Sequence, residues 1–169
     1  RSLDTLGLIH EQLLDHRPQP CAEGWILVPV ALARKRSGTF YTPPSLARAT
    51  VDKTLAPLLL GRSDAQLLEL CVCDPAMGSA VFLLEALAHL VEARVAAGSD
   101  NSCARRRELA ERCLYGVDLD PQAVELARLA LWLAVGDPEL ACDFAAARLR
   151  HGDARSEERR VGKECATLC

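Results

Sequence analysis

The chain of 169 residues is 50% hydrophobic and 25% charged, which is enough apolar material for one substantial core. Its formal net charge of −3 gives no overall attraction to nucleic acid, and it has no apolar run of the ~18 residues that a membrane span needs. Its eight cysteines are scattered, no secretory signal is visible and no Cys-x-x-Cys pair occurs. These features favour reduced thiols and a cytoplasmic location over disulfides or a metal site.

Both ends of the chain predict a fragment of a longer protein. The chain begins at Arg1 without a methionine, so we expect an upstream segment. Residues 155–165 read RSEERRVGKEC, which matches, codon for codon, an in-frame translation of a common sequencing adapter. We therefore predict that the natural sequence ends near Ala154 and that residues 155–169 are a disordered artefact. The alternative is a solvated, charged tail.

Residues 1–33 are predicted to form a helical and connecting segment. Apolar residues at helical spacing predict a helix over residues 2–15, and the prolines at positions 18 and 20 would break it. Residues 24–30 form an apolar run that contains Pro29, which predicts an edge strand or a hairpin. The basic residues 34–36 then suit a solvated loop or a phosphate contact.

A second helix is predicted to begin beside a pair of aromatic residues. Thr42 is placed to cap this helix, because the first turn of a helix leaves N–H groups without partners. Pro43 suits that first turn because proline has no N–H group. The helix should run to about Leu60 and stop at Gly61 in a left-handed conformation. Phe40 and Tyr41 precede the cap, where they would pack in the core or cover one side of a bound cofactor.

The stretch over residues 70–84 predicts a buried parallel strand, a tight loop and a helix N-terminus. An apolar run ends at Asp74 and Pro75, turns through small residues and continues as a helix to about Ala97. Cys71 and Cys73 should be small buried residues of the strand. Such a junction directs N–H groups beyond the sheet, where ligands of open α/β sheets bind. The predicted buried face of the helix consists of Leu84, Leu87, Val91 and Val95.

Two more strands are predicted further along the chain. Residues 101–112 suit a short polar helix or loop, and residues 114–118 form a strand that ends in Asp118. Asp120 and Pro121 are typical of a capped helix start, and a third strand over residues 148–151 follows. Alternating strands and helices predict a right-handed parallel α/β unit. The predicted buried residues of the middle helix are Val124, Ala127, Leu131 and Ala134.

An aspartate follows each of the three predicted strands: Asp74, Asp118 and Asp153. Each alone could be a loop residue or a helix cap. Together they indicate a nucleoside site, in which Asp118 accepts from both ribose hydroxyls and Asp153 accepts from an exocyclic amine. The loop lacks the three glycines and acid spacing of a nicotinamide site, and it lacks the Gly-Lys-Ser or Gly-Lys-Thr of a phosphate-binding loop. S-adenosylmethionine, a nucleoside without pyrophosphate, fits better.

These motifs resemble the N-terminal part of an N6-adenine DNA methyltransferase of the restriction–modification type, over roughly residues 3–154. Residues 6–14 are similar to the helix that precedes the domain in long single-chain members, and residues 38–44 to the upstream cofactor motif. Residues 74–82 are similar to the cofactor loop, 115–121 to the ribose motif and 152–153 to the adenine-contacting motif. The implied S-adenosylmethionine contacts are Tyr41, Thr42, Pro43, Asp74, Ala76, Gly78, Ser79, Phe82, Asp118, Leu119 and Asp153.

The resemblance implies a partial class I, Rossmann-like methyltransferase fold over residues 34–154. It also implies duplex DNA as partner, with an adenine flipped out of the helix, and target-recognition and nuclease domains that are absent from this chain. No membrane is implied. The alternatives are a methyltransferase for protein glutamine or ribosomal RNA, or a non-catalytic nucleotide-binding module.

Two features depart from the family pattern. Ala80 stands where the family has glycine, and a left-handed conformation there would cost roughly 1–2 kcal/mol. The catalytic string of Asn or Asp, two prolines and an aromatic residue does not occur after Asp153. We therefore expect this chain to lack catalytic residues and to be inactive by itself.

Overall fold

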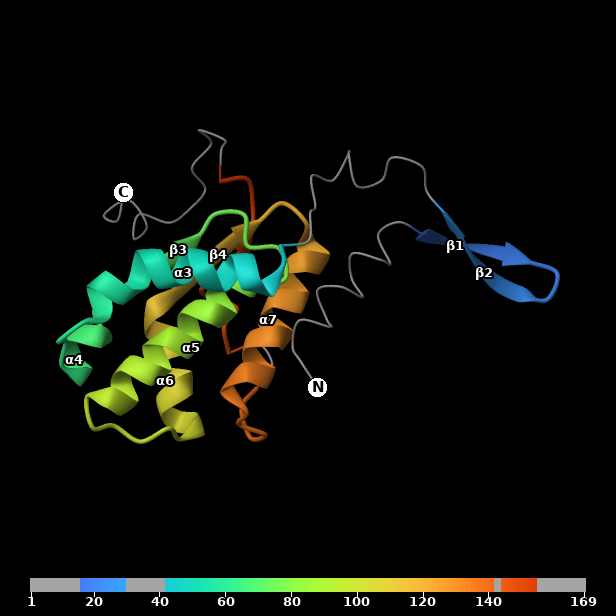
Figure 1. Ribbon diagram of the computed structural model, residues 1–169. Coiled ribbons are helices and arrows are strands. Elements are labelled where there is room, and N and C mark those ends of the chain that lie inside the picture. Colours follow the sequence, from blue (N-terminus) through green and yellow to red (C-terminus); the bar gives the residue numbers. More distant parts are fainter. Residues whose placement is uncertain (1–15, 30–41, 142–143, 155–169) are drawn as a thin grey trace.

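The computed structural model describes residues 16–29, 42–141 and 144–154. The helix expected over residues 2–15, the aromatic pair at 40–41 and the segment 155–169 lie outside these ranges. β1 (His16–Cys21) and β2 (Gly24–Pro29) form an antiparallel hairpin, which confirms the hairpin prediction for this segment. Figure 1 shows the hairpin set apart from the other described elements.

Three parallel strands form the sheet of the α/β unit. β3 (Val72–Asp74) pairs with β4 (Leu114–Asp118), which pairs with β5 (Leu149–His151), so the strand order follows the chain. Asp118 is the register partner of His151, and both stand at the carboxyl ends of their strands. The predicted parallel α/β unit and the extent of the middle strand are thus confirmed.

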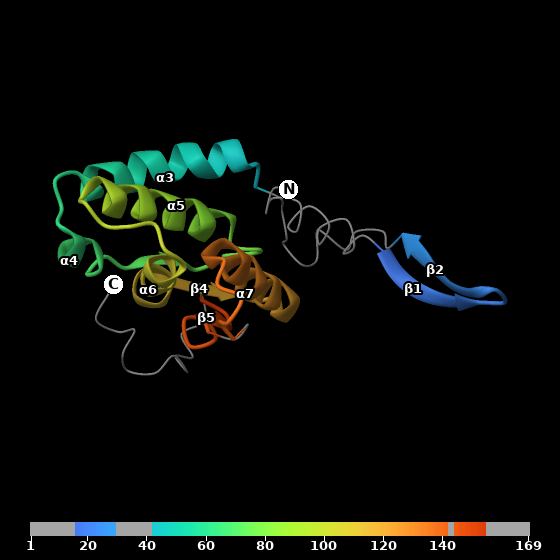
Figure 2. The same cartoon turned by 90° about the horizontal axis from the view of Figure 1, so that it is seen from below.

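Five helices occur among the described residues: α3 (Pro44–Leu59), α4 (Asp64–Leu67), α5 (Val81–Ala96), α6 (Cys103–Cys113) and α7 (Pro121–Val135). Helix α5 contacts α3, α6, α7 and the strands β3 and β4, so it is the central helix of the unit. Figures 1 and 2 both show α3 running alongside α5, with the two helices beginning at the same end.

The start of α3 corrects the predicted cap. Pro43, not Thr42, occupies the N-cap position, and its carbonyl accepts hydrogen bonds from the N–H groups of Leu46 and Ala47. The reason is that Pro44 disfavours helical geometry in the residue before it, and Pro43 has an extended ψ of 136°. The predicted stop is confirmed, because Gly61 follows the helix with a φ of 71°.

The buried face of α5 also differs from the prediction. Leu87 is buried as expected, but Leu84 and Val91 are only half-buried and Val95 is 46% exposed. The helix face that packs on the core includes Arg94. Because Arg94 is charged, the spacing of apolar residues alone indicates the neighbouring face. The buried residues are Leu83, Ala86, Leu87, Leu90 and Arg94.

Arg94 is buried because two acids on other helices satisfy its guanidinium. Its side chain is only 1% exposed and donates to Asp64 at the start of α4 over 2.5 and 2.8 Å. It also donates to Glu108 of α6 over 3.1 Å. The bond from Arg94 holds the pKa of Asp64 below its usual value. Arg94 therefore joins α4, α5 and α6 and has a structural role.

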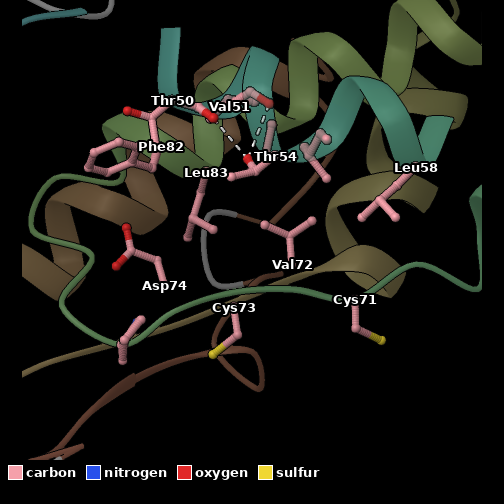
Figure 3. A pocket seen from close by; sticks show the side chains of 13 residues that line it. Thr50, Val51, Thr54, Leu58, Cys71, Val72, Cys73, Asp74, Phe82 and Leu83 are labelled. Carbon is pink, nitrogen blue, oxygen red and sulfur yellow. Dashed lines mark hydrogen bonds between the residues drawn. The ribbon is translucent and has the colours of Figure 1, made fainter. Parts of the chain in front are cut away.

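Two further burial predictions are corrected. Cys71 and Cys73 are exposed, because β3 is an edge strand of the described sheet and their side chains point away from α3 (Figure 3). In α7, Val124, Ala127 and Leu131 are buried as predicted, but Ala134 is half-buried and Val135 takes its place. The predicted cap of α7 is confirmed, since the Asp120 carboxylate accepts from the Gln122 N–H over 2.9 Å.

A histidine makes the stability of the α3–α5 contact depend on pH. His89 Nε2 lies 2.5 Å from Asp52 Oδ1 on α3, and Nδ1 lies 2.7 Å from the Glu85 carbonyl oxygen. Both partners accept only, so both bonds require a protonated ring. Burial lowers the pKa of His89, but the bonds to Asp52 and Glu85, with the nearby charges of Asp52 and Glu92, raise it above its usual value overall.

We predict that His89 stabilises the protein most at pH values below about 6.5, the ordinary pKa of histidine in an unfolded chain. Because the folded-state pKa is raised, this contribution should be lost as the pH rises through that value. Urea unfolding at about pH 6 and about pH 9 should show a larger loss of stability for the wild type than for His89→Gln. Parallel losses in the two proteins would contradict the prediction.

Candidate functional site

The loop between β3 and α5 rests on the end of β4. Asp74 Oδ1 accepts from the Ala76 N–H over 3.0 Å, and the Met77 N–H donates to the Val117 carbonyl over 3.1 Å. Met77 is buried beneath the loop, and a Cβ at Gly116 would lie 2.3 Å from its sulfur. A Cβ at this position would therefore force the buried Met77 side chain to shift. A glycine inside a strand pattern is the signal that could have predicted this contact.

One carboxylate joins this loop to the turn after β4. Asp118 Oδ2 accepts from the Gly78 N–H over 2.8 Å, and Oδ1 accepts from the Asp120 N–H over 2.9 Å. A carboxylate has about four lone-pair sites, so the half-buried Asp118 can still accept from two further donors. The structure thus brings together two predicted site residues that are 40 positions apart in the sequence.

The end of β5 meets the same turn. The Gly152 N–H donates to the Asp118 carbonyl over 2.9 Å, and His151 Nε2 lies 3.0 Å from the Leu119 carbonyl oxygen. Leu119 is 62% exposed although it is a large apolar residue. Asp153, which follows the end of β5, is also exposed. Three predicted site residues, Asp118, Leu119 and Asp153, therefore follow neighbouring strands at one edge of the sheet.

A pocket of about 310 Å³ lies between α3, α5 and β3 (Figure 3). Its walls are mostly apolar, and Asp74 and Phe82 line it together with Thr50. Asp74 Oδ2 is buried and has no hydrogen-bond partner among the described residues. Burial raises the pKa of Asp74 above its usual value and the charge of Asp118 adds to this, although the Ala76 N–H opposes it. The pocket therefore offers a buried acceptor that lacks a donor.

The other predicted site residues lie at the start of α3 and in the loop after β3. Thr42 is half-buried and Pro43 exposed at the start of α3, at the end of the unit where α5 also begins. In the loop, Ala76 is exposed, whereas Gly78 and Ser79 are half-buried. Tyr41 lies outside the described residues. In the described part of the chain, no group of three or more His, Cys, Asp or Glu side chains could hold a metal ion.

Comparison with known proteins assigns the chain to a protein family. A family model described as N-6 DNA methylase matches residues 2–154. The chain belongs to this N-6 DNA methylase family. It is 23% identical over 174 aligned residues to a protein of Methanocaldococcus jannaschii named "Putative type II restriction enzyme and methyltransferase". The alignment covers 78% of this chain but 14% of that relative, so the chain spans a small part of the relative's length.

No solved structure matches the chain significantly. In the ranges that the structure describes, no helix has the length and apolar character to cross a membrane.

The loop of this family member contains a strained alanine. Ala80 has a φ of 69°, which confirms that the position needs a left-handed backbone, and its side chain is fully buried. We predict that Ala80→Gly raises the free energy of unfolding by about 1 kcal/mol, because glycine adopts this conformation without the Cβ clash. Urea unfolding measures the change.

The matched control is Ala127→Gly, since Ala127 is equally buried but lies inside α7. There glycine should lower stability by about 1 kcal/mol, because helical backbone favours alanine. A loss of stability in both variants would contradict the strain at Ala80.

Proposed function

We propose that this chain is the cofactor-binding part of a site-specific DNA methyltransferase that transfers a methyl group from S-adenosylmethionine to adenine N6. The proposal extends the family membership, which concerns residues 2–154. The observation that carries it is the hydrogen bond between Asp118 and the Gly78 N–H, because it joins the carboxylate that we propose as the ribose acceptor to the loop after β3. The parallel sheet with covering helices is consistent with the class I, Rossmann-like fold that we propose for residues 34–154.

The residues present fit the chemistry of S-adenosylmethionine. Asp118 retains two acceptor sites, which is the number that the two ribose hydroxyls require. The buried Oδ2 of Asp74 lacks a donor, and the α-ammonium of the amino-acid end would supply one. Leu119 presents exposed apolar surface suited to a purine ring. Asp153 would accept from the exocyclic amine of that ring.

The remaining proposed contacts belong to the amino-acid end. Ala76, Gly78 and Ser79 form the loop against which that end would lie, with the Ala76 and Gly78 N–H groups already bonded to Asp74 and Asp118. Phe82 would exclude water from the pocket wall. By the family resemblance, Tyr41, Thr42 and Pro43 would contact the same end of the cofactor. When bound, the cofactor supplies the electrophilic methyl group. This chain's own residues hold it at both ends and orient it, and such positioning can supply much of a rate enhancement.

The substrate that we propose is duplex DNA, in a restriction–modification or phage-defence system in the cytoplasm. The name of the relative from Methanocaldococcus jannaschii supports this setting, and the family description favours DNA over protein glutamine or ribosomal RNA. The residues that hold the adenine amine, and the target-recognition or nuclease domains, would belong to other parts of the whole protein. The net charge of −3 agrees with this, since DNA-contacting surfaces are basic.

The test is the binding of S-adenosylmethionine to the full chain by isothermal titration calorimetry. We expect measurable binding, and we expect Asp118→Ala to weaken it by about tenfold or more, because hydrogen bonds to a charged acceptor are worth about 1.5–3 kcal/mol. Asp137→Ala is the matched control, since Asp137 Oδ1 also accepts from a nearby N–H, that of Glu139, but follows α7. Equal affinities in wild type and Asp118→Ala would refute the site, and no binding would favour a non-catalytic module.

We further predict that the chain alone does not methylate DNA. It has no Asn or Asp followed by two prolines and an aromatic residue after Asp153, so nothing in it would position the adenine amine. Incubation with duplex DNA and S-adenosylmethionine carrying a labelled methyl group should leave the DNA unlabelled. Label in adenine would show that the catalytic group lies within these residues.

A further inference from the structure

His151 belongs to none of the motifs that predicted the site, yet it contacts the centre of it. It is the last residue of β5 and the register partner of Asp118 on β4. Its ring nitrogen Nε2 lies 3.0 Å from the carbonyl oxygen of Leu119, 32 positions earlier in the sequence. The ring therefore bridges the carboxyl ends of two neighbouring strands, at the edge where the proposed nucleoside site lies.

The identity of the partner decides which nitrogen carries the proton. A carbonyl oxygen can only accept a hydrogen bond, so Nε2 must be the donor and must carry a proton. This requirement is met by the Nε2–H tautomer of the neutral ring and also by the protonated ring. The bond can therefore form with the ring neutral or charged.

The turn after β4 is held at each residue from Asp118 to Asp120. The Asp118 carbonyl accepts from the Gly152 N–H over 2.9 Å, and the Asp118 carboxylate accepts from the Asp120 N–H over 2.9 Å. The Asp120 carboxylate caps α7 in turn. Between these two acids, His151 supplies the bond that holds the carbonyl of Leu119. The Leu119 side chain remains turned out to solvent with 62% of its surface exposed.

We propose that His151 is a positioning residue for the nucleoside end of the cofactor, acting through the Leu119 carbonyl. This inference rests on the proposed function. By holding the peptide that joins Leu119 to the α7 cap, His151 sets the direction in which the apolar side chain of Leu119 and the free lone pairs of Asp118 face a purine nucleoside. Without this hydrogen bond, the turn after β4 has one contact fewer with the end of β5. Ligand binding must then order the turn, which lowers the affinity.

If His151 only supported the overall fold, its replacement would lower the global stability of the protein. His151 is exposed, so replacing it removes little buried surface and should leave global stability within about 0.5 kcal/mol. Its contribution should appear instead in local order of the turn and in affinity for the nucleoside.

The experiment compares His151→Leu with His151→Gln in the full chain. Calorimetric titration with S-adenosylhomocysteine should show affinity weakened about five- to tenfold in His151→Leu, the loss expected for one hydrogen bond. The side-chain amide of His151→Gln can donate to the same carbonyl and should restore most of the affinity. Titration with 5′-methylthioadenosine, which lacks the amino-acid end, should show the same fold loss.

The matched control is Arg150→Gln, because Arg150 is the exposed neighbour in β5 but donates to the Ala147 carbonyl instead. It should bind both compounds like the wild type. Unchanged affinity in His151→Leu, failure of His151→Gln to restore it, or a loss confined to S-adenosylhomocysteine would each overturn the proposal.

A second measurement needs no ligand. Amide hydrogen exchange at Asp120 and Gln122, whose N–H groups are bonded within the turn, should be about fivefold faster in His151→Leu than in the wild type. If the wild type binds neither compound, the proposed function fails, whereas unchanged exchange overturns the role of His151 by itself.

Discussion

The site depends on one carboxylate that satisfies backbone donors from two separate turns. Asp118 accepts from Gly78 in the loop after β3 and from Asp120 in the turn after β4. Parallel strands make this possible, because their carboxyl ends meet at the same edge of the sheet. The bond joins the small-residue loop to the proposed ribose acceptor, and a bond of this kind reduces the order that binding has to create.

The packing of Met77 also holds the loop after β3 against β4. The Met77 side chain fills the space against Gly116, where an added Cβ would displace its sulfur, and the Met77 N–H donates to Val117 of β4. The chain then has to turn into α5 through Ala80 with a positive φ. The strain at Ala80 is held in place by this packing and by the core contacts of α5. Strained backbone of this kind is often found at functional sites.

Much of the fold was predictable because its signals are local. Strands β3 and β4 end in aspartates, Asp120 and Pro121 start α7, and Gly61 follows α3 with a positive φ. These features depend on residues close together in the chain. Apart from the cap of α3, the wrong predictions concern which face of an element is buried. The buried row of α5 includes Arg94, which only the acids of α4 and α6 make acceptable, and the exposure of Cys71 and Cys73 follows from the place of β3 at the sheet edge. Neither fact has a local signal.

For the site, the sequence by itself determined which residue types follow each strand, and the prediction of a nucleoside site rests on them. Strand ends, caps and small-residue loops are properties of short segments. Only the tertiary structure decided that Asp118 bonds to Gly78, that Asp74 keeps a buried oxygen without a donor, and that His151 reaches the Leu119 carbonyl. These contacts join residues that are distant in the chain, and they exist because sheet register and helix packing place them side by side.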